Sequence, residues 1–182
     1  MRFDTRARVL AAAVAVAVIL LAAAPAHAAP PTTSCSFTGL AGEIHPGVRA
    51  ILNGPGGAGA YEFAGQAVDC VHTDRDGNRL HSGARITSIG VYANLICGTG
   101  SVQSSTDPLD TQVLFEHPGI PDITQLDYQI QFVNGTGALQ VVEANGAPVS
   151  GGGPVVITPY EGDCIDENVT AFDVAGSFTI VR

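Results

Sequence analysis

The chain has 182 residues and is acidic, because eight Arg and no Lys stand against 17 Asp and Glu, for a formal charge of −9. An acidic surface repels phosphate backbones and anionic headgroups, so we expect neither nucleic acid nor a membrane surface as a partner. The length suits a single domain with one hydrophobic core.

The first 28 residues have the three parts of a secretory signal peptide. Three Arg precede an uninterrupted apolar run of 16 residues, and Pro25 and the small-residue sequence AHA follow it. The run is shorter than the roughly 20 residues that span a bilayer. We therefore predict cleavage after Ala28 and a secreted, extracellular domain of residues 29–182. Removing three Arg and one Asp changes its formal charge from −9 to −11.

Apolar and polar residues alternate with period two through most of residues 29–182, and no amphipathic helix of three turns stands out. In DYQIQFV, for example, Tyr128, Ile130 and Phe132 share one face, as a half-buried strand requires. The segments that we predict as strands are residues 34–40, 60–71, 79–93, 95–103, 111–115, 127–133, 136–144, 154–160 and 171–182.

Connections rich in Gly, Pro and Asp separate these segments, among them NGPGGAGA, EHPGIPD and NGAPVSGGGP. Many short strands with such turns are typical of all-β folds. We predict one antiparallel domain of about nine to ten strands, which is either an immunoglobulin-like β-sandwich or a β-barrel. The pattern leaves both architectures open.

Four cysteines, an even number in a chain predicted to be exported, indicate two disulfides. Three pairings are possible. The segments around Cys35 and Cys70 look like antiparallel strands that place these residues opposite each other, so we favour Cys35–Cys70 together with Cys97–Cys164. A cysteine metal site is the competing interpretation, but the chain has no C-x-x-C spacing.

The stretch VHTDRDGNRLHS, residues 71–82, predicts the tip of a β-hairpin. Asp76-Gly77 is a dipeptide favoured for two-residue type I′ turns, and a turn centred there places His72 opposite His81. Two imidazoles on facing positions can chelate Zn²⁺, Cu²⁺ or Ni²⁺, although a stable site usually needs a third protein ligand. We interpret the pair as surface histidines and keep a divalent-metal site as the alternative. We expect no other cofactor.

The run YEGDCIDEN gathers carboxylates around Cys164, namely those of Glu161, Asp163, Asp166 and Glu167. Such a group could bind Ca²⁺ or supply the acid and base of glycoside hydrolysis. A solvated acidic loop attached by a disulfide explains the same residues, and this is our interpretation. Hydrolysis would require two acids within about 5 to 10 Å of each other in a cleft.

Two segments repeat the order G-T-G-x-apolar-Q, CGTGSVQ from Cys97 and NGTGALQ from Asn134. We interpret them as Gly-marked kinks or bulges that recur in one sheet, with an ancient duplication as the alternative.

Together, CSFTG, YEFAGQAVDC, CGTG, GDC and VAGSFTIV resemble the layout of small, uncharacterised secreted all-β proteins of actinobacteria. The resemblance covers residues 35–181 and implies an exported, disulfide-bonded bacterial protein. It transfers no catalytic residue.

The chain also lacks a G-x-S-x-G elbow, an H-E-x-x-H motif and a reactive unpaired Cys. We therefore predict a non-enzymatic binding or cell-surface protein whose partner is an extracellular protein, a glycan or a small ligand. Two alternatives stay open. One is a small-ligand-binding barrel, which needs an apolar cavity, and the other is a carboxylate-dependent hydrolase.

Overall fold

The computed structural model describes residues 28–50 and 55–182, which form nine β-strands. This part of the chain has no helix, and so none that is long and apolar enough to cross a membrane. Residues 1–27 of the predicted signal peptide lie outside the described residues. The strands are β1 Thr32–Val48, β2 Gly57–Thr73, β3 Arg79–Ile96, β4 Thr99–Ser104, β5 Thr111–Phe115, β6 Leu126–Val133, β7 Thr136–Ala144, β8 Ala147–Glu161 and β9 Val169–Val181.

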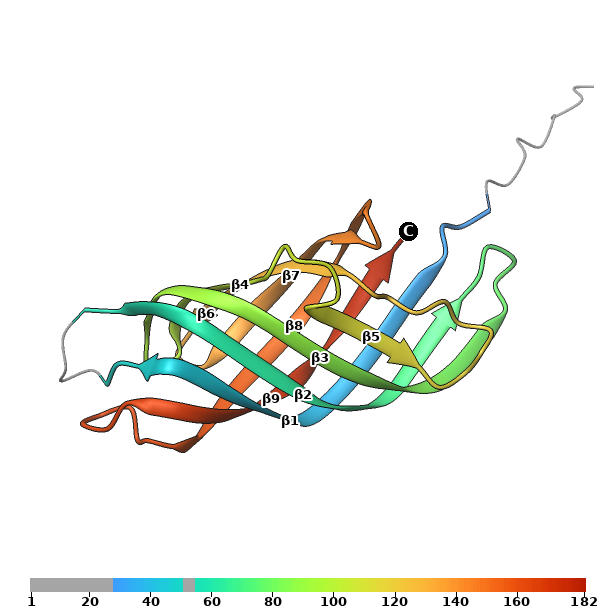
Figure 1. Ribbon diagram of the computed structural model, residues 1–182. Helices are drawn as coiled ribbons and strands as arrows, with labels where there is room; N and C mark the ends of the chain where they lie inside the picture. Colours follow the sequence, from blue (N-terminus) through green and yellow to red (C-terminus); the bar gives the residue numbers. More distant parts are fainter. Residues whose placement is uncertain (1–27, 51–54) are drawn as a thin grey trace, which may run out of the picture.

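Eight of these strands close into an antiparallel barrel (Figure 1). The order around the barrel is β2-β1-β9-β8-β7-β6-β4-β3, and β3 pairs with β2 to complete the ring. The fold is therefore a barrel, and the immunoglobulin-like sandwich is excluded. A closed ring pairs both edges of every member strand, which removes the exposed edges of an open sheet.

The remaining strand, β5, continues the path of β4 along β3. β4 pairs with residues 90–96 of β3 and β5 pairs with residues 84–88. Residues 105–110, which we call the β4–β5 loop, leave the sheet between the two strands. The base of this loop is closed by Ile89, whose carbonyl accepts the N–H of Ser105 and whose N–H donates to the carbonyl of Asp110, each at 2.9 Å.

Polar side chains meet inside the barrel. The hydroxyl oxygens of Tyr61 and Tyr128 lie 2.6 Å apart, and Ser88 Oγ lies 2.7 Å from the Tyr128 hydroxyl and 2.9 Å from Thr111 Oγ1. Burial raises the pKa of Tyr128 to about 12 and that of Tyr61 well above its ordinary value, so both phenols stay neutral. Each buried hydroxyl has a partner, as a low-dielectric interior requires.

Both predicted disulfides form. Cys35 and Cys70 are direct partners in the β1–β2 pairing, with Cα atoms 4.1 Å apart, and both are buried. Cys97 and Cys164 are joined across 67 positions of sequence, with Cα atoms 5.1 Å apart. The pairing inferred from opposed strand patterns is thus confirmed.

The two ends of the barrel are built from different connections. The hairpin end carries the turns at residues 74–78 and 145–146 and the segment 116–124. The cavity end carries the turns at residues 97–98 and 134–135 and the loop 162–168 between β8 and β9. Figure 1 shows that loop beside the end of β1 and the start of β2, away from the hairpin tip.

Both copies of the G-T-G pattern begin in tight hairpin turns. The interpretation as kinks or bulges is wrong for the second copy, whose strand pairing is regular, but the first copy does lie at a register irregularity between β3 and β4. Cys97 and Gly98 have φ of 45° and 76°, and Asn134 and Gly135 have φ of 51° and 77°. Positive φ at both central residues is the signature of a type I′ turn, for which Asn-Gly is a preferred dipeptide. Asn134-Gly135 follows this preference, and Cys97 takes the place of the Asn in the first copy. The repetition therefore reflects one turn requirement met twice at the cavity end.

Candidate functional site

The turn of the hairpin at residues 71–82 differs from the prediction by one residue. The N–H of Gly77 donates to the carbonyl of Asp74 at 3.2 Å, and Gly77 has φ of 84°. This is a type I turn followed by a left-handed glycine, which makes a three-residue loop instead of a two-residue loop. The carboxylate of Asp74 favours it, because Oδ1 accepts the backbone N–H groups of Asp76 (2.8 Å) and Asn78 (2.9 Å).

The shifted register separates the two histidines. His72 pairs with Leu80 and His81 pairs with Val71, so the prediction that the imidazoles face each other is wrong. A shift by one residue sends a side chain to the opposite face of a strand. The interpretation of both residues as surface histidines is wrong for His72, which is buried, with Nδ1 2.9 Å from Thr33 Oγ1.

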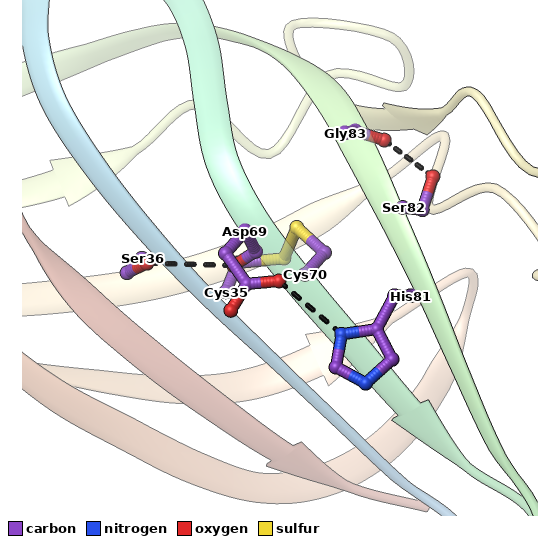
Figure 2. A network of polar contacts seen from close by, with 7 residues as sticks. All are labelled: Cys35, Ser36, Asp69, Cys70, His81, Ser82 and Gly83. Carbon is purple, nitrogen blue, oxygen red and sulfur yellow. Dashed lines mark hydrogen bonds and ion pairs between the residues drawn. A yellow bond between two sulfur atoms is a disulfide. The ribbon is translucent and has the colours of Figure 1, made fainter.

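The ring of His81, in contrast, is exposed and turns toward Asp69, with Nδ1 3.5 Å from the carboxylate (Figure 2). The two-histidine arrangement that the hairpin prediction required is therefore absent. Within residues 28–50 and 55–182, no three His, Cys, Asp or Glu side chains are grouped so that they could hold a metal ion.

The acidic loop is organised by one of its own carboxylates. Oδ1 of Asp163 accepts the backbone N–H groups of Ile165, Asp166 and Glu167 at 2.9, 3.1 and 3.0 Å. These bonds hold the pKa of Asp163 well below its ordinary value, and a hydrogen bond with Asp163 together with charge repulsion raises the pKa of Asp166. The Glu161 carboxylate accepts the hydroxyl of Thr170 at 3.1 Å.

All four predicted carboxylate residues, Glu161, Asp163, Asp166 and Glu167, are exposed. Asp163 and Asp166 are close to each other, but neither lines the cavity at this end of the barrel. Their arrangement is that of a capped surface loop, in which one carboxylate satisfies backbone donors. None of the four acids is among the described residues that line the two principal hollows of the molecule, whereas glycoside hydrolysis needs a pair of acids in a cleft.

The strongest candidate site is a cavity of about 400 Å³ at the cavity end of the barrel. Its floor consists of inward-facing apolar side chains that are almost fully buried, those of Ile44, Val48, Leu95 and Val169. Its rim is more accessible and is formed by Cys97, Gly98, Asn134, Gly135, Ile157, Pro159 and Cys164. None of these described lining residues carries a charge.

The rim is held together by hydrogen bonds between neighbouring turns and by a disulfide. The N–H of Gly135 donates to the carbonyl of Gly98, and the N–H of Ile157 donates to the carbonyl of Gly135, each at 2.9 Å. The disulfide between Cys97 and Cys164 ties the first of these turns to the loop 162–168. Backbone bonds and a covalent link therefore hold the rim above the cavity.

The Cys97–Cys164 disulfide of this site follows from the sequence pattern, but the apolar lining does not. The alternation of β8 could have marked Ile157 as inward-facing. The alternation of β3 could not have marked Leu95, because an irregularity after Ala93 moves Leu95 off the strand's period-two row. Neither pattern could show that these two residues meet Ile44 and Val169, which come from distant segments, around an unfilled volume.

The lining determines what the cavity can do. Apolar walls favour an apolar guest, and the described lining, which carries no charge, disfavours an ion. The described lining also holds no carboxylate, imidazole or free thiol, so it offers binding without acid, base or nucleophile. Comparison of the chain with protein-family models, with curated proteins and with solved structures finds no match.

Proposed function

We propose that this protein is an exported, non-enzymatic binding protein that holds a small uncharged apolar molecule at the cavity end of its barrel. The observation that carries the proposal is the apolar cavity of about 400 Å³. Its volume lies within the range of roughly 300 to 1,000 Å³ typical of small-molecule sites. Small antiparallel barrels elsewhere hold one small ligand in this manner.

Export is supported by the predicted signal peptide and by two disulfides, since disulfides persist mainly in oxidising compartments. The resemblance to secreted actinobacterial proteins points in the same direction. A glycan is disfavoured as the guest, because sugars need polar partners and the described floor of this cavity is aliphatic.

The test is a fluorescence titration of the purified, oxidised protein with N-phenyl-1-naphthylamine, a neutral apolar dye. We expect saturable binding that is abolished by Ile157→Trp, because the larger side chain fills the cavity. Val156→Trp is the matched control, since its neighbour Val156 points outward and is 43% exposed. The control should bind the dye like the unmodified protein.

Two results would overturn the proposal. The first is equal affinity of the dye for the unmodified protein and for folded Ile157→Trp. The second is no saturable binding below about 100 μM dye, the affinity expected of a weak but specific apolar site. Circular dichroism of each variant verifies that the barrel is intact.

A further inference from the structure

A second hollow, of about 410 Å³, lies on the outer face of the barrel across β1, β2 and β3. We call it the outer groove. Ala41, Ala64 and Thr87 lie in one register row of its floor. Leu109 of the β4–β5 loop and Tyr160 of β8 also line it, and these apolar side chains are 62% and 53% exposed.

The outer groove concentrates negative charge. Glu43 and Glu62 are direct cross-strand partners and both line the groove, with Asp110 as a third acid. Like charges on facing strand positions destabilise a sheet, so this pair costs stability unless a cation lies near it. The groove lining includes no Arg among the described residues, and the imidazole of His45 lies 3.4 Å from the Glu43 carboxylate.

We propose that the outer groove binds a small organic cation, an ammonium group attached to an apolar body. The cation relieves the repulsion between Glu43 and Glu62, and the apolar body lies against the alanine floor and Leu109. The ring of Tyr160 supplies a face for cation–π contact. A groove of about 410 Å³ has the volume of a small-molecule site.

The test uses matched small probes. Amide chemical shifts of the ¹⁵N-labelled protein are followed during titration with 2-phenylethylammonium and with its neutral counterpart 2-phenylethanol. We expect the ammonium to shift resonances of β1, β2 and β3 around Glu43 and Glu62, and the alcohol to leave them unchanged. The affinity should fall as the ionic strength rises from about 0.01 M to about 1 M, because exposed charges are screened.

The double variant Glu43→Gln/Glu62→Gln should weaken binding of the ammonium about tenfold, since it removes two favourable charge interactions and keeps the shape. Glu116→Gln is the control, because it removes one exposed acid that lies outside the groove. It should leave the affinity unchanged.

Equal binding of the alcohol, unchanged affinity in the double variant, or no groove shifts at about 10 mM ammonium would overturn the proposal. A trilysine peptide that binds the groove more tightly than the ammonium would also overturn it and would assign the groove to a protein partner. These outcomes are independent of the apolar cavity, whose residues report separately in the same spectra.

Discussion

The two ends of the barrel are closed by different means. At the hairpin end, Val113 and Ile123 exchange backbone hydrogen bonds of 2.8 and 3.0 Å, and Ile120 and Ile123 are buried. At the cavity end, two turns and a loop are joined by backbone bonds and the Cys97–Cys164 disulfide, and about 400 Å³ remains beneath them. At the hairpin end, the side chains that close the barrel also fill its interior. At the cavity end, a covalent link closes the barrel and leaves interior space for a guest.

The largest expected effect comes from removing either disulfide. The chain-entropy model assigns about 4 kcal/mol to each, given loops of 35 and 67 residues. Cys35→Ala/Cys70→Ala should cost about 6 kcal/mol in total, because the buried sulfurs also leave a void. Cys97→Ala/Cys164→Ala should cost about 4 kcal/mol and also weaken dye binding.

Urea denaturation and the dye titration measure both effects. Equally tight dye binding by the Cys97→Ala/Cys164→Ala variant and by the unmodified protein would contradict this contrast between the ends, because the disulfide would then not define the rim.

A smaller difference in stability is expected between alanine variants of two asparagines that occupy equivalent turn positions at opposite ends of the barrel. Asn134 and Asn145 have φ of 51° and 53°, so replacement by Ala costs each a similar strain of about 1 kcal/mol. Asn145 Oδ1 also accepts the N–H groups of Thr124 (2.8 Å) and Gln125 (3.2 Å). Asn145→Ala should therefore destabilise the protein by about 1.5 kcal/mol more than Asn134→Ala.

Thermal and urea unfolding of the two variants measure the difference. Equal losses would show that side-chain bonds at the hairpin end contribute nothing beyond the turn itself.

The smallest effect is a pH dependence that differs between the ends. Hydrogen bonds with Asn78, and further backbone bonds, lower the pKa of Asp74 at the hairpin end, and backbone N–H groups lower that of Asp163 further. A carboxylate with a depressed folded-state pKa stabilises its loop above its unfolded pKa, and the stabilisation is lost as the pH falls through the folded value. Both loops should therefore be ordered at pH 5 and loosen in acid.

The turn at Asp74 should loosen at a higher pH than the loop at Asp163. Amide resonances of Asn78 and Ile165, followed from pH 5 downward, measure the order. Simultaneous loosening would mean that the barrel unfolds globally before either carboxylate is protonated.

Local patterns predicted most strands closely. Thr111–Phe115 and Thr136–Ala144 agree with the predicted bounds at both ends, because turn residues flank each segment. The predicted start of β8 was residue 154 instead of Ala147, because the glycines before residue 154 are typical of a loop. Cβ atoms at Gly151 and Gly153 would collide with the carbonyl oxygens of Thr179 and Ser177, so these glycines permit close strand packing.

The hairpin register was missed for a different reason. The Asp76-Gly77 dipeptide alone favours a two-residue turn, but the carboxylate of Asp74 bonds to the backbone of Asp76 and Asn78 and selects the longer turn. One residue of difference moved His72 to the interior and left His81 outside, which removed the candidate metal pair.

The sequence alone determined the all-β class, the approximate strand positions and the pairing of the disulfides. These depend on period-two alternation, turn residues and cysteines on facing strands, which act over short stretches of chain. Only the tertiary structure decided between sandwich and barrel, and only it revealed the cavity and the outer groove. Closure requires β3 to meet β2 after the whole sheet has curved, and both hollows are lined by residues from distant strands. These contacts between strands that are distant in sequence depend on the accumulated twist and stagger of all eight strands, which no local pattern specifies.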